Sequence, residues 1–268
     1  MLLKILIIPL ISLGYNLFFS GEAWAWGPAI HTVIACKILS ESVQLLPAIA
    51  EVIRAFPLEY LYGSLAADFF VGKGQKKKKG HSHSWETAHR FMKEAVDDQE
   101  AAYAWGFFSH LAADVIAHNY FVPKLIQEAS SSKRVGHIYW EARADYTIEP
   151  AYIKIARDVL SMDHLGCDDL LRSAVGKRKK GLRARKSIFT QSVKLTDYLR
   201  SSPSFSLVYQ GSRYRISEEY ITFMVHLSYR LVRDILKHPV SSTCLSYDPI
   251  GSRNLRLAGR FSVLSKVF

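Results

Sequence analysis

Three polar residues recur at intervals of four in the stretch HLAADVIAH, namely His110, Asp114 and His118. In an α-helix, each step of four residues rotates the side chain by only about 40°, so these three lie along one stripe. The flanking residues, YAWGFF before the stripe and YF after it, are nearly all apolar, which predicts a buried stripe. Buried imidazole and carboxylate groups are costly unless they pair with each other or bind a metal ion. The stretch therefore predicts either a metal site or a hydrogen-bonded His–Asp–His ladder.

A second pair with the same spacing follows in GHIYWEARAD, where His137 precedes Glu141 by four residues. Such a pair is also common on solvated helix faces, so its meaning depends on its position after the first stretch. If the first helix ends at His118 and a connection follows, then His118, His137 and Glu141 can converge on one cation. Two histidines and a carboxylate that leave a fourth position open are the ligand pattern of a catalytic zinc site.

Other candidate ligands lie upstream of these helices. Asp68 in SLAADFF has apolar neighbours on both sides, so its carboxylate needs a helix end, a basic group or a metal ion. The stretch HSHSW supplies His81 and His83 at the end of a lysine-rich segment, 71–84, that we expect to be an exposed loop. A loop histidine is usually solvated, and the spacing does not choose between these two.

The N-terminal segment has the pattern of an export signal. Residues 1–20 carry a single charge, Lys4, before an apolar run, and Ala23 and Ala25 then form a small-x-small cleavage pattern. Cleavage would fall before Trp26, although an uncleaved membrane anchor is the alternative reading. The new α-amine would have a pKa of about 7.7–8.0, low enough for a metal ion to displace its proton. The amine and carbonyl of Trp26, with His31 five residues later, could then hold one ion.

Helical periodicity dominates the rest of the chain, and strand patterns are scarce, so we expect an all-α bundle of antiparallel helices. The expected helices are 28–46, 48–55, 58–71, 84–96, 99–120, 133–146, 148–160, 185–200 and 216–238. We expect a signal peptide or anchor at 1–25, a zinc-binding catalytic core at 26–160, and a C-terminal helical extension at 161–268 that begins with a basic linker and packs on the core. Residues 239–268 have weak periodicity and are left without elements.

The net charge of +11 favours anionic partners such as phosphate esters, anionic lipid surfaces or nucleic acid.

Taken together, these motifs resemble the zinc-dependent phospholipases C, which are related to the single-strand-specific zinc nucleases. The resemblance spans about residues 26–160 and implies an all-helical fold that holds two or three zinc ions in a cleft. WGPAIH looks like the start of the mature family chain, which implies Trp26 and His31 as ligands. The resemblance also implies that Asp68 is a ligand or general base and that a loop histidine, His83 or His81, is a ligand.

The later motifs match the family in the same order. The H-x₃-D motif implies His110 as a ligand and Asp114 as a bridging carboxylate, and H-x₃-E implies His137 and Glu141 as ligands of a further site with His118. One spacing departs from the family pattern, because His118 follows Asp114 by four residues where the family has six.

The implied activity is metal-assisted hydrolysis of a phosphodiester, with Asp68 and Asp114 as catalytic residues. We expect an exported phospholipase C-like enzyme that acts on a phospholipid, with an anionic membrane surface as a further possible partner. The alternatives are a zinc nuclease for single-stranded nucleic acid and a non-catalytic helical metal-binding protein.

Overall fold

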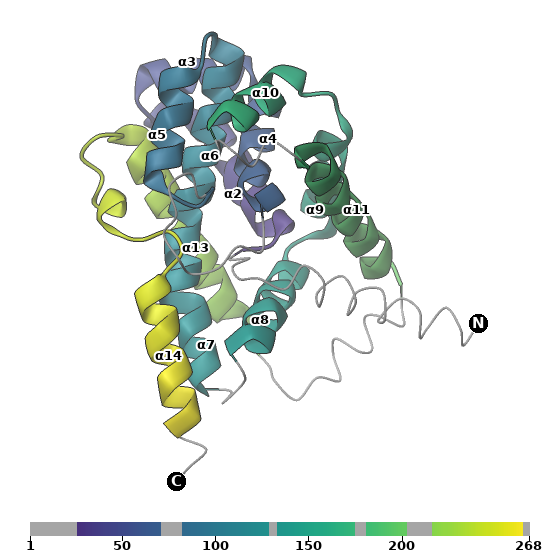
Figure 1. Cartoon of the computed structure of the whole chain (residues 1–268), viewed down its shortest axis with the longest axis vertical. Coiled ribbons are helices and arrows are strands. Elements are labelled where there is room, and N and C mark those ends of the chain that lie inside the picture. The colour runs from purple at the N-terminus through teal and green to yellow at the C-terminus, as the bar shows by residue number, and fades with distance from the viewer. Residues whose placement is uncertain (1–25, 71–81, 129–132, 175–180, 203–215, 265–268) are drawn as a thin grey trace.

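The computed structural model describes residues 26–70, 82–128, 133–174, 181–202 and 216–264, and all regular elements in these ranges are helical. The expected all-α class is therefore confirmed (Figure 1). The expected signal segment at 1–25 and His81 lie outside the described residues. Within the described part of the chain, no helix combines the length and the apolar character that a membrane span requires.

The helices carry the labels of Figure 1. Those of the first half are α2 (Pro28–Ser40), α3 (Pro47–Ala55), α4 (Pro57–Ala66), α5 (Trp85–Glu94), α6 (Asp98–Ile116) and α7 (Val122–Glu128). Those of the second half are α8 (Lys133–Thr147), α9 (Pro150–Ser161), α10 (Leu165–Ala174), α11 (Leu182–Arg200), α13 (Glu218–Lys237) and α14 (Ser252–Leu264). Short helical turns are η1 (Ser42–Gln44), η2 (Ala67–Phe70), η3 (Ala117–Phe121) and η5 (Thr243–Ser246).

Helix starts follow local chemistry. Proline occupies the first turn of α2, α3, α4 and α9, where its missing N–H would have no helical partner anyway. Ser84, Asp97 and Ser217 cap α5, α6 and α13 by accepting a hydrogen bond from a backbone N–H three residues later. These signals can be read in the sequence, so most starts fall within one to three residues of expectation.

Helix α6 is the centre of the molecule, with α4, α5 and α13 packed against it (Figure 1). Two glycines let α4 and α6 approach closely. A Cβ on Gly63 would lie 2.0 Å from the carbonyl oxygen of Tyr103, and one on Gly106 would lie 2.1 Å from that of Tyr60. Because neither glycine carries a side chain, the two backbones touch. This contact positions His110, which lies one turn after Gly106 on α6.

Several expectations about elements were wrong. The expected helix 28–46 ends at Ser40, and α10 forms in a stretch to which we had assigned no helix. Its inward face consists of only a few residues, including Cys167, Leu170 and Leu171, which is too short a pattern to recognise. Residues 239–268, left without elements, contain η5 and α14, and α14 packs along α7 (Figure 1).

Candidate metal centre

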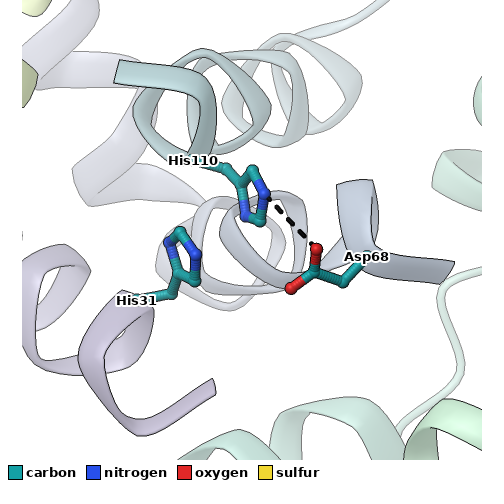
Figure 2. A group of neighbouring side chains, drawn as sticks. All are labelled: His31, Asp68 and His110. Atoms are coloured by element: carbon teal, nitrogen blue, oxygen red, sulfur yellow. Dashed lines mark ion pairs between the residues drawn. The ribbon is translucent and has the colours of Figure 1, made fainter. Parts of the chain in front are cut away.

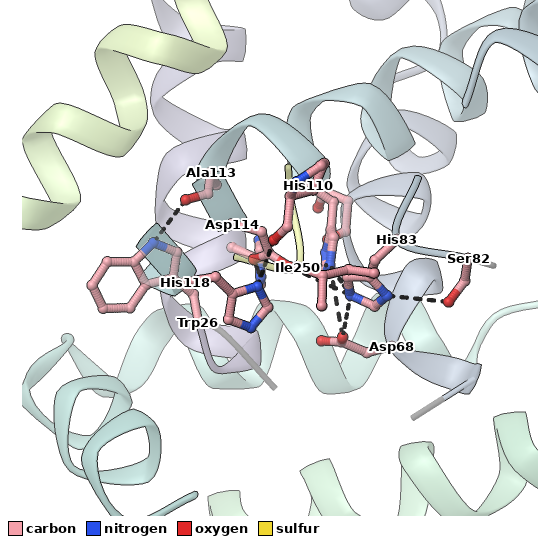
Figure 3. Close-up of polar contacts among 12 residues, drawn as sticks. Trp26, Asp68, Ser82, His83, His110, Ala113, Asp114, His118 and Ile250 are labelled. Carbon is pink, nitrogen blue, oxygen red and sulfur yellow. Dashed lines mark hydrogen bonds and ion pairs between the residues drawn. The ribbon is translucent and has the colours of Figure 1, made fainter. Parts of the chain in front are cut away.

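Five buried side chains from four segments meet beside the C-terminal half of α6 (Figure 3 labels all but His31). They are His31 of α2, Asp68 of η2, His83 just before α5, and His110 and Asp114 of α6. Each has at most 3 % of its surface exposed. Ser82 and His83 are both buried, so the end of the segment 71–84 is not the exposed loop that we expected. Residues 71–81 of that segment lie outside the described residues.

Asp114 faces the histidines with both of its oxygens. Its Oδ1 lies 3.3 Å from Nε2 of His31, while its Oδ2 lies 3.2 Å from Nε2 of His110 and 3.4 Å from Nε2 of His83. Asp68 Oδ1 lies 3.3 Å from Nε2 of His83 and 3.6 Å from Nε2 of His110. The two carboxylates thus face the same ring nitrogens from different sides.

These distances suit a metal ion better than a hydrogen-bonded ladder. His31 Nε2 and all four oxygens of Asp68 and Asp114 are buried without a hydrogen-bond partner among the described residues. A tetrahedral zinc ion with bonds of about 2.0–2.1 Å holds its nitrogen and oxygen ligands roughly 3.3–3.4 Å apart. The observed separations of 3.2–3.6 Å match that spacing, and buried polar atoms without partners are otherwise costly.

Two sets of three side chains could each hold an ion. One consists of His31, Asp68 and His110 (Figure 2), and the other of His83, His110 and Asp114. His110 Nδ1 lies 2.9 Å from the carbonyl oxygen of Ser64 on α4, and a carbonyl can only accept, so Nδ1 carries the proton. Nε2 is then the only atom of His110 that can bind a metal ion. Because His110 belongs to both sets, it could serve only one of two ions, and the other ion would rely on the remaining side chains.

The protonation of the cluster without metal follows from its crowding. Burial raises the pKa of Asp114, but His110, His31 and His83 outweigh it and hold that pKa well below its usual range. Burial lowers the pKa of His83, but its contacts with Asp114 and Asp68 outweigh this and raise it to about 9. Burial and then His110 lower the pKa of His31, against the attraction of Asp114. Without metal, His83 is therefore protonated at neutral pH, and a metal ion that binds this histidine would displace the proton.

Two further carboxylates of α8 border the cluster. Glu141 is buried, and burial followed by the charges of Asp114 and Asp68 raises its pKa well above the usual range. Burial also raises the pKa of Asp145 to about 6, although its Oδ1 accepts a hydrogen bond of 2.8 Å from the backbone N–H of Ile30. Such a concentration of buried carboxylates is suited to a dication.

Asp145 is a residue that sequence reasoning missed. It follows Glu141 by the same four-residue step that joins His137 to Glu141, and this continuation was the available signal. The Asp145 carboxylate accepts a hydrogen bond from the first turn of α2, which carries His31. Asp145 therefore positions a residue of the cluster.

The helix expected over 99–120 does not end at residue 120. It passes into the π-helical turn η3, closed by a hydrogen bond from Val122 N–H to the Ala117 carbonyl, and continues as α7. His118 is fully buried in this turn, and its Nδ1 lies 2.5 Å from the carbonyl oxygen of Pro249. The backbone of His137 lies in α8 but its side chain is outside the described part, so the convergence of His118, His137 and Glu141 stays a prediction.

Trp26 lies directly beside the cluster. Its indole Nε1 donates to Ser228 Oγ of α13 at 2.9 Å and to the carbonyl of Ala113, next to Asp114, at 3.2 Å. The following residue, Gly27, is packed so closely that a Cβ there would lie 2.3 Å from the carboxyl carbon of Asp145.

Comparison with known families agrees with this geometry. The model of the zinc-dependent phospholipase C family matches residues 30–181, more than half of the 268-residue chain. The chain therefore belongs to this family of phosphodiesterases, and the two buried triads lie within the matched region. No curated protein and no solved structure matches the chain.

Proposed function

We propose that this protein is an exported phospholipase C-like enzyme that hydrolyses a phospholipid at a centre of two or three zinc ions. The observation that carries the proposal is the position of Asp114, whose two buried oxygens face different histidines at 3.2–3.4 Å and have no hydrogen-bond donor among the described residues. A carboxylate in this position can bridge two ions. Zinc at such a centre lowers the pKa of a bound water and stabilises charge on phosphoryl oxygens.

The chain's own residues have distinct proposed roles. Asp114 would hold two ions through its two oxygens, and the ring nitrogens of His31, His83 and His110 would serve as further ligands. Asp68 turns Oδ1 toward His83 and His110, which leaves Oδ2, a buried oxygen without a hydrogen-bond partner in the described chain, to bind an ion or accept a proton from the attacking water. His118, His137 and Glu141 are proposed as ligands of a further ion.

Activity assays with matched variants test this proposal. Wild-type protein is assayed on phosphatidylcholine vesicles, on a chromogenic phosphocholine ester and on single-stranded DNA, beside Asp114→Asn and Asp168→Asn. We expect hydrolysis of the phosphocholine substrates, lost in Asp114→Asn and kept in Asp168→Asn, whose buried carboxylate lies in a separate hydrogen-bonded cluster. Cleavage of DNA alone would support the nuclease reading, and no hydrolysis of any substrate by zinc-loaded protein would reject the enzyme proposal.

We further assign to Trp26 a role that depends on export. Cleavage before this residue would give Trp26 a free α-amine, which we propose as a chelating group together with the Trp26 carbonyl. Mass spectrometry of the exported protein would identify the N-terminus. A chain that starts at Trp26 should bind zinc more tightly than one that starts at Ala25, in which the same nitrogen is an amide; equal zinc affinity would exclude the amine as a ligand.

A further inference from the structure

The segment 247–254 joins η5 to α14, includes the first three residues of α14, and lies against the π-helical turn that carries His118. We call it the C-terminal strap. Pro249 accepts from His118 at 2.5 Å, and the carbonyl of Asp248 accepts from Asn119 Nδ2 at 2.9 Å. Asn254 Nδ2 donates to Asn119 Oδ1 at 3.1 Å. Figure 3 shows Ile250 of the strap next to the cluster.

The strap contains a tight turn that requires glycine at position 251. Gly251 N–H donates to the carbonyl of Asp248 at 2.9 Å, and the Asp248 carboxylate accepts from the N–H of Ile250 at 3.2 Å. Gly251 has a φ of 61°, which favours glycine. A Cβ at this position would also lie 2.3 Å from the carbonyl oxygen of His118 and 2.8 Å from its Cβ. Gly251 therefore permits both the turn and its close contact with His118.

The contact determines which nitrogen of His118 can bind a metal ion. The carbonyl of Pro249 can only accept a hydrogen bond, so Nδ1 of His118 must carry the proton and Nε2 carries the lone pair. Ser64 does the same for His110 from α4. The two supports differ in origin, because Ser64 lies within the region matched by the family model and the strap lies beyond it.

We propose that the C-terminal strap is a positioning element of the metal centre, which orients His118 and fixes its tautomer so that Nε2 serves as a zinc ligand. This inference rests on the proposed metal function. It assigns to Gly251 and Pro249 a role in metal binding and gives the chain beyond the family match a part in the centre. His118 follows Asp114 by four residues where the family has six, and it lies in the π-helical turn η3. A π-helical turn points its side chains in other directions than a regular α-helix does, and the strap contacts this turn.

Two glycine substitutions provide a matched test. Gly181 also has a positive φ, of 93°, but a Cβ there would meet nothing within 4 Å. Gly251→Ala and Gly181→Ala therefore both strain a left-handed backbone, and only the first disturbs His118. Full-length variants with the same N-terminus are compared by zinc content, zinc affinity and the visible spectrum of the Co²⁺-substituted protein.

We expect Gly251→Ala to lose one metal equivalent or to bind it about 10–100-fold more weakly, with an altered Co²⁺ spectrum, as for other outer supports of metal ligands. Gly181→Ala should match wild type in all three. A folded Gly251→Ala protein with wild-type zinc affinity and spectrum would overturn the proposal. If Gly251→Ala does not fold, Asp248→Ala, which removes the side-chain bond to Ile250 and keeps Gly251, decides by the same criteria.

A double-mutant cycle separates positioning from general damage. If the strap acts through His118, Gly251→Ala should cause no further loss of zinc affinity in a His118→Ala background. Additive losses would show that the strap does not act through this histidine. Because the readouts are metal binding and spectra, the result is independent of whether the enzyme acts on a phospholipid; absence of hydrolysis would reject the proposed function alone.

Discussion

Two buried clusters of this protein contain a carboxylate surrounded by aromatic or imidazole rings, and they differ in how that carboxylate is satisfied. In the cluster around Asp168 on α10, Tyr62 donates to Oδ1 and Lys186 donates to Oδ2 at 2.8 Å. His164 stacks on Tyr62 with ring centroids 3.9 Å apart. In the candidate metal centre, neither oxygen of Asp114 accepts a hydrogen bond from the described residues.

The difference shows that burial alone does not identify a functional carboxylate. The Asp168 cluster has a cation and a hydroxyl for its negative charge, so it is a structural network that joins α4, α10 and α11. The Asp114 cluster gathers carboxylates and histidines around oxygens that accept no hydrogen bond from the described residues, and a dication is the simplest group that would satisfy them. The following predictions test this contrast, from the largest expected effect to the smallest.

The largest difference should appear in catalysis. Asp114→Asn removes one anionic oxygen from the proposed bridge and should lower the rate of phosphodiester hydrolysis at least about 10³-fold, or roughly 4 kcal/mol. Asp168→Asn should stay within about threefold of wild type. Steady-state rates on the chromogenic ester measure both, and equal losses in the two variants would remove the distinction between the clusters.

Removal of metal should separate the clusters by stability. Chelation should lower the free energy of unfolding by about 4 kcal/mol relative to protein in zinc at about 1,000 times its dissociation constant. The same comparison in Asp114→Asn should show a much smaller difference, and in Asp168→Asn an unchanged one. Denaturant unfolding with and without zinc checks this, and a wild-type protein indifferent to zinc would contradict the metal assignment.

The Asp168 cluster should matter for stability alone. Lys186→Met leaves Asp168 without its cation, and we expect a loss of about 2 kcal/mol, less than for a fully buried pair because both partners are slightly exposed. Zinc affinity should not change. The double variant Lys186→Met/Asp168→Leu removes the unpaired charge and should recover part of the loss; reduced zinc binding in Lys186→Met would show that the clusters are coupled.

The smallest expected effect is the change of zinc affinity with pH. His83 has a pKa raised to about 9 in the metal-free protein, so metal must displace its proton, and zinc affinity should rise about tenfold per pH unit from 6.5 to 9. Stability of the metal-free protein should change in the opposite direction. The protonated ring stabilises the fold fully below its unfolded pKa of about 6.5, and this is lost as the pH rises through 9.

Calorimetry in buffers of different ionisation enthalpy should detect the released proton, and His83→Gln should remove this part of the pH dependence. An affinity that does not vary between pH 6.5 and 9 would show that His83 is not displaced from its ion pairs. Lys186→Met should follow the wild-type profile.

Much of the site was predictable because its signals are local. The four-residue step in HLAADVIAH places His110 and Asp114 on one stripe of α6 whatever the rest of the chain does, and the structure confirms that this stripe is buried. The prolines and caps likewise determine where helices start. Neither α10 nor the elements within 239–268 could be predicted, since their apolar patterns are short and their folding depends on the partner helices.

The sequence by itself determined the residue types, the helical class and the spacing of His110 and Asp114 along α6. Only the tertiary structure decided which other groups reach that stripe. Ser64 reaches His110 because Gly63 and Gly106 allow two helices to touch, and Pro249 reaches His118 from a strap 131 positions away in the chain. The physical reason is that a helix sets angles and distances over a few residues, whereas contacts over tens of residues depend on how complete faces pack together.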